Sequence, residues 1–420
     1  MGSKLIIIAV LVLGVFAIAQ LMRLYEISSK MTKKGETEVN IRDNNMNGKL
    51  MLVFMILLTI GFIWLMKKYG WTGRGDAASV HGAEYDWLMG LNLIIIIIGC
   101  FITNFLLFYF SFKFVKKPGV KAYWFPHDNK LEMIWTVVPA IILAIIIILG
   151  LRSWNEITGP SDNDAIRIEL FSKQFDWTAR YAGEDNKLGK FDYKLTTDAN
   201  ELALMTTATI DTAIMQMENG LSGIKTIEAK LNDRNVMMVP DDREKMMNEL
   251  ERKQRLIRLL HQIKERHDSK LDAMAYDDII QKDTLYLCSD QAYEFNFRAK
   301  DVIHSAYFPH FRAQMNNVPG QVTRFKFTPN VTTEEMRERM NNPNFNYILM
   351  CNKICGGAHY KMKMIVVVLT KAEFNKWLDG KKGSTFKDTF MPPAPAPAPV
   401  EGEGAPTEGV VVEEVAVEAA

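Results

Sequence analysis

Four apolar stretches in the first part of the chain restrict its fold more than any other feature. Each approaches the roughly 20 residues that a helix needs to cross a bilayer, and each is essentially free of charge inside. They cover residues 5–22, 50–66, 88–112 and 133–151. Within lipid, a single segment satisfies its backbone polar groups only as a helix. We therefore predict a membrane anchor over residues 1–152 with about four transmembrane helices.

The distribution of basic residues between the loops predicts the orientation of this anchor. Segments 23–49 and 113–132 carry six and five lysines or arginines, whereas segment 67–87 carries three. Loops rich in lysine and arginine stay in the cytoplasm. Four crossings then place everything after Arg152 on the opposite side of the membrane.

The first apolar stretch also has features of a cleaved secretory signal. Lys4 precedes it, and Ala17 and Ala19 resemble a small-residue cleavage site. Cleavage would leave three crossings and a mature N-terminus outside, against the charge of segment 23–49, which favours four retained helices. The sequence alone leaves the fate of residues 1–22 open.

The part after the anchor has strand character on both sides of a helical region. Short, turn-separated strands predict an all-β sandwich or barrel over residues 153–197 and 271–385. The predicted strands cover residues 165–171, 284–288, 293–297, 322–327, 347–350 and 364–369.

Residues 198–270 change to helical periodicity. One apolar helix is predicted over about 202–217, and a longer amphipathic helix follows Pro240. We predict a helical hairpin inserted into the β domain, with His261 and His267 on its solvated face. The last segment, 386–420, is rich in Pro, Ala, Glu and Val and is predicted to be disordered.

Soft metal ligands are concentrated in one short loop of the predicted β domain. Cys351, Cys355, His359 and Met362 supply two thiols, an imidazole and a thioether. Soft sulfur with imidazole selects copper or zinc over oxygen-loving cations. Since a thioether is a poor zinc ligand, the set favours copper. The net charge of +1 gives no sign of a nucleic-acid partner.

A second imidazole is required, and His304 is the best candidate because its segment also adjoins a predicted strand. Two thiolates can bridge two copper ions, with one terminal imidazole on each and two weak ligands. Such a centre has no open position for a substrate and is expected to relay electrons. A Cys351–Cys355 disulfide and a zinc knuckle are the alternatives. His359 and Met362 at fixed offsets argue against both.

These residues resemble subunit II of the haem–copper cytochrome oxidases. The copper loop of that family reads Cys-x-Glu-x-Cys-Gly-x-x-His-x-x-Met, and only the Glu is replaced here, by Lys353. Other segments resemble the family in the same order along the chain. They are the last membrane helix at 131–139, the aromatic patch at 174–177 and the first-ligand segment at 300–320, within matching regions 130–181 and 283–370.

The resemblance implies a cupredoxin-like Greek-key domain with two copper ions in a CuA centre. The implied ligands are His304, Cys351, Cys355, His359 and Met362, with the carbonyl of Lys353 as the sixth group. It also implies the electron-accepting subunit of a respiratory cytochrome c oxidase. That subunit would lie in the bacterial cytoplasmic (inner) membrane, with its copper domain on the periplasmic side.

The resemblance also implies the partners of the chain. Electrons would come from cytochrome c, or from a cytochrome c domain of a donor complex, and would pass to haem in subunit I. Oxygen reduction and proton pumping would belong to subunit I, a component of an oxidoreductase that translocates protons. The other oxidase subunits and membrane lipid are further expected contacts.

Four more positions take their expected roles from the resemblance. Phe175 and Trp177 lie in the aromatic patch where electrons enter, although Phe175 replaces the family's Trp. Glu132, at the cytoplasmic start of a membrane helix, is expected at the entrance of a proton path shared with subunit I. The alternative is that Glu132 only lies at the membrane–water interface and has no role in proton transfer. Lys353 cannot replace the family's Glu in holding magnesium, so that site is expected to be lost or rebuilt.

Three other functions fit parts of the sequence. A copper-free structural subunit of a quinol-type oxidase would have no reason to keep the ligand set. A copper chaperone would need an exchangeable site with open coordination. The copper domain of nitrous oxide reductase belongs to a soluble enzyme. The haem type, the identity of the donor and the role of the insertion at 198–270 are not predicted.

Overall fold

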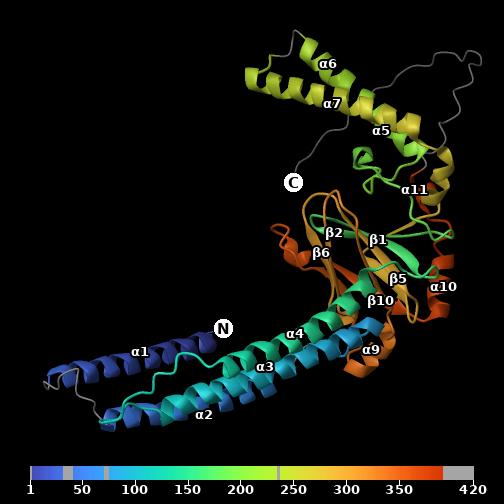
Figure 1. Cartoon of the computed structure of the whole chain (residues 1–420). Helices are drawn as coiled ribbons and strands as arrows, with labels where there is room; N and C mark the ends of the chain where they lie inside the picture. The colour runs from blue at the N-terminus through green and yellow to red at the C-terminus, as the bar shows by residue number, and fades with distance from the viewer. Residues whose placement is uncertain (1, 32–40, 71–74, 234–236, 391–420) are drawn as a thin grey trace, which may run out of the picture. The chain divides into compact units, whose positions relative to one another are not determined.

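The computed structural model describes residues 2–31, 41–70, 75–233 and 237–390; for 2–11 and 29–31 it describes the backbone alone. The chain divides into two compact units, Met1–Ile157 and Thr158–Ala420. The first unit contains the predicted anchor and the second contains the rest (Figure 1). Each unit is described by itself.

All four apolar stretches are helical, as predicted. The helices of the anchor are α1 (Gly2–Met31), α2 (Ile41–Tyr69), α3 (Val80–Lys113) and α4 (Asn129–Thr158). Within the described residues, α2, α3 and α4 are long and apolar enough to cross a membrane. Ser79 caps α3 by accepting a hydrogen bond from the Gly82 N–H at 3.1 Å, which satisfies one of the first-turn donors.

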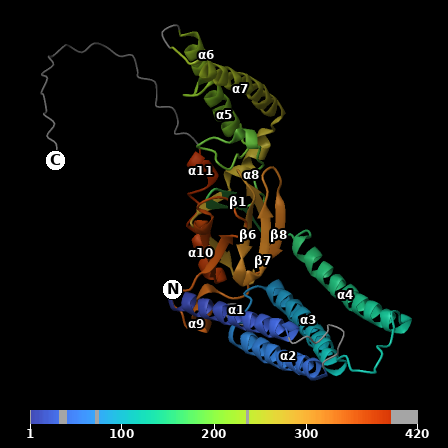
Figure 2. The same ribbon diagram turned by 90° about the vertical axis from the view of Figure 1, so that its left-hand side faces the viewer.

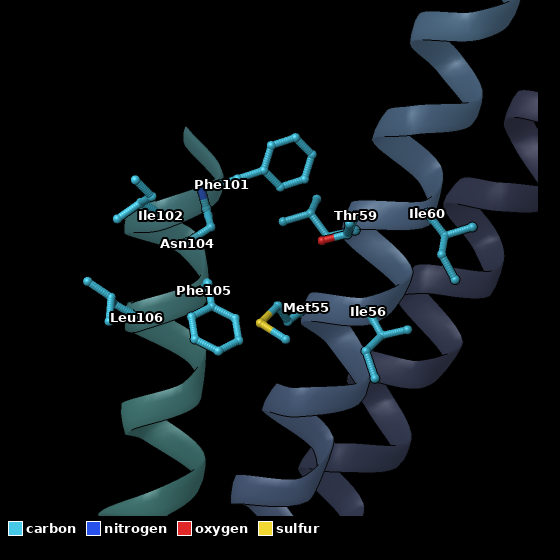
Figure 3. Close-up of a pocket in the computed structure, with 10 residues that line it drawn as sticks. Met55, Ile56, Thr59, Ile60, Phe101, Ile102, Asn104, Phe105 and Leu106 are labelled. Carbon is cyan, nitrogen blue, oxygen red and sulfur yellow. The ribbon is translucent and has the colours of Figure 1, made fainter. Parts of the chain in front are cut away.

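Helices α2 and α3 pack through aromatic edge contacts. The Phe54 and Phe108 rings lie 5.4 Å apart and the Phe62 and Phe101 rings 5.8 Å apart, both edge-to-face. Between these contacts a groove of about 540 Å³ is lined almost entirely by apolar side chains (Figure 3). Its lining includes Met55 and Thr59 of α2 and Asn104 and Phe105 of α3.

The second unit is built on two five-stranded sheets (Figures 1 and 2). One sheet has the order β3-β2-β1-β5-β8 and the other the order β4-β10-β9-β6-β7. The strands are β1 (Ile166–Lys173), β2 (Asp176–Tyr181), β3 (Ile279–Lys282), β4 (Thr284–Cys288), β5 (Tyr293–Ala299), β6 (His304–Phe308), β7 (Ala313–Asn317), β8 (Thr323–Phe327), β9 (Tyr347–Cys351) and β10 (Lys363–Leu369).

Apolar side chains from both sheets form the core. Phe295 of β5 stacks on Phe327 of β8, with ring centroids 4.8 Å apart, and meets Phe308 of the other sheet at 5.7 Å. Tyr181 donates its hydroxyl proton to the carbonyl of Tyr286 at 2.9 Å, which joins β2 to β4. The predicted combination of an apolar helical anchor and a domain of two β-sheets with inserted helices is confirmed.

The insertion has three main helices: the two that were predicted, at about 202–217 and after Pro240, and a short third helix between them that was not. They are α5 (Thr207–Asn219), α6 (Ile224–Asn232) and α7 (Pro240–Arg266), which lie side by side (Figure 1). Gly220 ends α5 as its C-cap, and Gly223 is the N-cap of α6. Short helices flank this group: η1 (Tyr193–Leu195), η2 (Ser269–Asp272) and α8 (Ala273–Tyr276).

The core of the insertion is small. Leu195, Ile210, Ala213, Ile214 and Leu260 form one buried cluster. His267, predicted on the solvated face, instead has only 4% of its side chain exposed, because its Nε2 lies 2.6 Å from the buried carboxylate of Asp272. His261 is half-exposed, as predicted.

The ordered domain extends slightly beyond its predicted end. Residues 386–390, assigned above to the tail, form helix α11 (Phe386–Phe390), and Phe386 packs into a buried cluster with Phe171, Leu202 and Leu204. An apolar ring that packs in this way belongs to the core. The remaining helices are η3 (Pro309–Phe311), α9 (Thr333–Met340), η4 (His359–Lys361) and α10 (Lys371–Asp379). The disorder predicted for 391–420 concerns residues outside the described ranges.

Candidate metal centre

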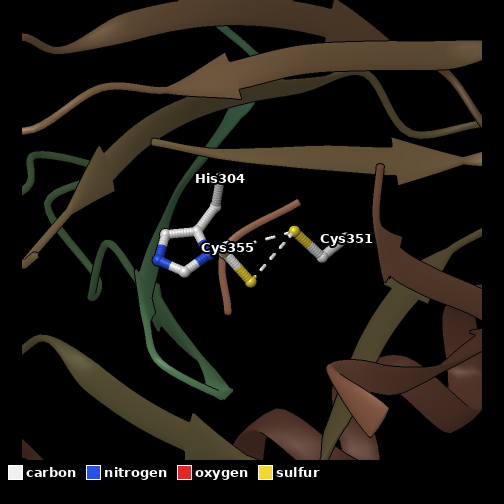
Figure 4. Close-up of side chains that lie close together, drawn as sticks. All are labelled: His304, Cys351 and Cys355. Carbon is white, nitrogen blue, oxygen red and sulfur yellow. Dashed lines mark hydrogen bonds between the residues drawn. The ribbon is translucent and has the colours of Figure 1, made fainter. Parts of the chain in front are cut away.

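Neighbouring strands bring the distant ligand segments together. Cys351 is the last residue of β9 and His304 the first residue of β6. These strands pair antiparallel, with Ala306 opposite Cys351. Because His304 lies two residues from that pairing on the same face, its ring reaches the Cys351 thiol. The predicted convergence of His304 with the cysteine loop is therefore present (Figure 4).

Each thiol has its own imidazole. The sulfurs of Cys351 and Cys355 lie 3.9 Å apart. The Nδ1 atom of His304 is 3.9 Å from the Cys351 sulfur, and the Nδ1 atom of His359 is 3.5 Å from the Cys355 sulfur. Donor atoms of His304, Cys351 and Cys355 all lie within 4.8 Å of one another.

The two weak donors also lie at the sulfurs. Met362 places its thioether 3.8 Å from the Cys355 sulfur. The carbonyl of Lys353 lies 3.2 Å from the Cys351 sulfur. The predicted set of five side chains and one carbonyl is thus grouped around one pair of thiols, with one strong and one weak donor beside each sulfur.

The chemistry of this donor set fits copper better than the alternatives. The two thiols are free, since their sulfurs are 3.9 Å apart and form no disulfide. A thioether buried to 1% exposure beside them is typical of copper and foreign to structural zinc. Most of the centre is buried: His304 is fully buried and both cysteines are less than one-tenth exposed, whereas His359 is partly exposed.

Burial and the neighbouring Cys351 thiol raise the pKa of Cys355 to about 11. Two thiolates side by side in a buried site repel each other unless a cation lies between them. Metal binding must therefore displace the thiol protons. The site is arranged so that two thiolates are stable when positive charge is bound.

Asp301 orients His304, a role that the sequence analysis did not assign. Its Oδ1 atom lies 2.9 Å from Nε2 of His304, on the side of the ring away from the thiol. A carboxylate on the outer nitrogen fixes the tautomer and leaves Nδ1 free as a ligand. The available signal was an Asp three residues before a candidate ligand His.

The turn between β1 and β2 covers the copper loop. Gln174 donates its backbone N–H to the Asp301 carboxylate at 2.8 Å and its side-chain amide to the Cys355 carbonyl. Phe175 lies against Gly356, where an added Cβ would come within 2.9 Å of the Phe175 ring. Gly356 also has φ +143°, in the region that favours glycine. One turn therefore contacts both ligand segments.

Phe175 and Trp177 occupy different positions at the centre. Phe175 is half-buried at the surface of the loop, whereas Trp177 is 1% exposed. The indole N–H of Trp177 donates to the Met362 carbonyl at 3.5 Å, and its ring meets the His304 ring edge-on at 6.3 Å. Both aromatic side chains contact the ligand residues or their loop, and their roles in electron transfer stay predictions.

Glu132 lies in the other unit and is not part of this centre. It is in the first turn of α4, its side chain is 43% exposed, and one carboxylate oxygen is 3.5 Å from Nδ1 of His127. An exposed carboxylate at a helix start is compatible with both predicted readings, so its role in a proton path stays a prediction.

Comparison with known proteins gives sequence relatives of one kind. The family model "Cytochrome C oxidase subunit II, transmembrane domain" matches residues 68–153. The chain is 24% identical over 336 residues to an alternative cytochrome c oxidase subunit 2 of Bradyrhizobium diazoefficiens, covering 79% of this chain and 91% of that protein. It is 21% identical over 334 residues to cytochrome c oxidase subunit 2 of Cereibacter sphaeroides, covering 79% and 88%.

Solved structures of low identity were also found. The periplasmic domain of subunit II of cytochrome oxidase from Bradyrhizobium japonicum matches at 13% identity with a TM-score of 0.26, covering 54% of this chain and 98% of that chain. A haem-copper terminal oxidase dimer matches at 16% identity with a TM-score of 0.17, covering 20% and 50%.

Proposed function

Since the chain is a relative of cytochrome c oxidase subunit II, we propose that it is the electron-accepting subunit of a respiratory cytochrome c oxidase. It takes electrons from cytochrome c, or from a cytochrome c domain of a donor complex, at a dinuclear copper centre. It passes them to haem in subunit I, where oxygen is reduced to water. The observation that carries this proposal is the pair of adjacent thiols, each with its own imidazole.

The protein residues would hold two copper ions between them. Cys351 and Cys355 would supply the sulfur ligands, His304 and His359 the nitrogen ligands, and Met362 and the Lys353 carbonyl the weaker contacts. When bound, the copper pair supplies a one-electron relay whose charge is shared by two metals. Burial of His304, Cys351, Cys355 and Met362 excludes water from most of the centre.

The residues around the ligands provide an entry point for electrons and hold the ligands in place. Phe175, in the turn between β1 and β2, is the partly exposed ring that lies against the copper loop at Gly356, next to the ligand Cys355. It is the natural point at which electrons enter. Trp177, buried between the Met362 carbonyl and the His304 ring, holds the frame of the centre. Asp301 holds His304 with its Nδ1 toward the thiol.

The anchor places this centre at a membrane. Its helices contact lipid and the other oxidase subunits, subunit I among them, in a bacterial cytoplasmic membrane, with the copper domain on the periplasmic side. Glu132 opens a proton path shared with subunit I. Lys353 excludes the usual magnesium site, and a magnesium ion bound beside it in the purified complex would contradict that part of the proposal.

Substitution of one bridging thiol tests the function. In the purified oxidase, Cys355→Ser removes a soft bridging ligand, so reduction of the complex by cytochrome c is expected to fall to background in stopped-flow measurements. The matched control is Cys288→Ser, a buried free thiol at the end of β4, which is expected to leave the rate unchanged. Normal electron transfer in the Cys355 variant would refute the proposal.

A further inference from the structure

Three segments form the surface around the copper centre, here called the docking face: residues 173–176, 300–303 and 351–363. They meet directly. Gln174 donates its backbone N–H to Asp301 and its side-chain amide to the carbonyl of Cys355. Lys300 donates its backbone N–H to Ser172, next to Lys173, at 2.9 Å. The charges of the three segments therefore belong to one end of the domain.

The docking face is basic. Its three segments contain five lysines, Lys173, Lys300, Lys353, Lys361 and Lys363, and two carboxylates, Asp176 and Asp301. The copper loop, 351–363, has three of the lysines and no carboxylate.

The carboxylates of the face are engaged within the protein. Asp301 accepts hydrogen bonds from His304 and Gln174, and Asp176 accepts one from the backbone N–H of Trp177. Outside the three segments, Glu201 offsets part of the charge, since it lies 2.6 Å from the ammonium of Lys173 and 3.3 Å from that of Lys300. Because residues 351–363 contain three lysines and no carboxylate, the surface beside the ligands still has a net positive charge.

The same face exposes apolar side chains next to the ligands. Ile354 is 87% exposed and Tyr360 68% exposed, and both are in the copper loop. Val302 and Ile303, which precede the ligand His304, are 37% and 44% exposed. Exposed apolar side chains within a charged surface are typical of a site that binds another protein.

We propose that this face binds an electron donor whose redox centre is exposed at its surface and is surrounded there by carboxylate side chains. The inference rests on the proposed function and names the chemistry of its partner. Opposite charge attracts the donor before contact and orients it. Ile354 and Tyr360 then provide a short-range apolar contact close to the copper ligands. A donor with a lysine-rich surface is repelled by the same face.

The test compares two donors on the purified, copper-loaded oxidase complex. Stopped-flow reduction of the copper centre is measured with one c-type cytochrome whose haem edge is surrounded by carboxylates and one whose haem edge is surrounded by lysines. Ionic strength is raised from about 0.01 M to about 0.15 M, which shortens the screening length from about 30 Å to about 8 Å. The acidic cytochrome is expected to react at least about tenfold faster at low salt. Its rate should fall as salt rises.

A charge-reversed variant identifies the face. Lys361→Glu combined with Lys363→Glu changes two exposed lysines beside the ligand Met362 and leaves every ligand in place. It is expected to slow the acidic cytochrome severalfold at low salt and to have little effect at high salt. Lys376→Glu combined with Lys387→Glu, on α10 and α11, is the matched control and should leave the rate unchanged.

The outcomes separate the two proposals. A complex without copper, or with copper that no cytochrome reduces, contradicts the proposed function. A copper centre that is reduced faster by the lysine-rich cytochrome, or equally by both, overturns the acidic-donor inference alone. So does a Lys361/Lys363 variant that loses subunit I without a change in salt dependence, because the face would then bind a permanent neighbour.

Discussion

The residues at the centre show how far ligand spacing can predict a site. Cys351, Cys355, His359 and Met362 share one loop, so their soft-ligand chemistry was visible in the sequence. The roles of Asp301 and Gln174 were not, because carboxylates and amides near a ligand are common. Only the folded turn shows which of them reaches the His304 ring or the Cys355 carbonyl.

Gly356 makes a prediction at this scale. Gly356→Ala would place a Cβ within 2.9 Å of Phe175 and Gln174 at φ +143°, which costs about 1–3 kcal/mol in backbone strain alone. We expect the copper loop to shift, so that the purified variant binds less copper and loses it at lower temperature.

The neighbouring glycine is the matched control. An added Cβ at Gly357 meets nothing within 4 Å, so Gly357→Ala is expected to keep its copper. Equal copper contents and equal thermal stabilities in the two variants would contradict the described packing of the turn on the loop.

At the scale of elements, strands with strong alternation were predicted well and short ones were missed. β4 and β8 have aromatic or branched residues in a clear pattern, whereas β7 (Ala313–Asn317) is mostly polar and gave no signal. Helix α6 was missed because it has only nine residues, too few for a clear apolar periodicity, and lies between the two predicted helices. Local sequence carries little information about which of several short helices pack together.

Leu260 tests the packing of the insertion. It is fully buried against α5, whereas its neighbour Leu259 is 41% exposed. Leu260→Ala is expected to cost about 2–5 kcal/mol of local stability and to speed hydrogen exchange in α5 and α7 without changing copper content. Leu259→Ala should have little effect. Equal exchange in both variants would show that α7 does not pack as described.

A buried ion network joins β1, β2 and β5. Glu169 lies 2.6 Å from both Arg180 and Arg298, and all three are nearly fully buried. Burial alone would raise the pKa of Glu169, but Arg180 and then Arg298 outweigh it and lower the pKa to about 2. Asp278, the second carboxylate on Arg180, titrates in a higher range because burial raises its pKa to about 7.

The lowered pKa of Glu169 predicts a pH dependence. An unfolded Glu titrates near 4.3, so Glu169 stabilises the fold fully above that pH and loses this contribution as pH falls toward 2. A shift of about two units corresponds to about 3 kcal/mol. Glu169→Gln is expected to lower the melting temperature at pH 7 and to flatten its acid dependence below pH 4.3. The exposed Glu334→Gln is the control; matching acid profiles would contradict the network.

For the whole molecule, the sequence predicted the two-part architecture because hydropathy separates membrane from soluble chain. The family model covers α3 and most of α4, but leaves α1 and nearly all of α2 outside. The copper-loop motif carries no information about α1, α2 or the three helices of the insertion. Hydropathy predicted α1 and α2, and periodicity predicted α5 and α7 but not α6.

Copper counting tests the central claim most directly. Metal analysis of the purified oxidase, combined with electron paramagnetic resonance, measures how many copper ions belong to this chain and whether they share one electron. We predict two copper ions per chain with a mixed-valence spectrum that disappears in Cys355→Ser. One copper or none on this chain, or a spectrum of a single isolated ion, would contradict the account.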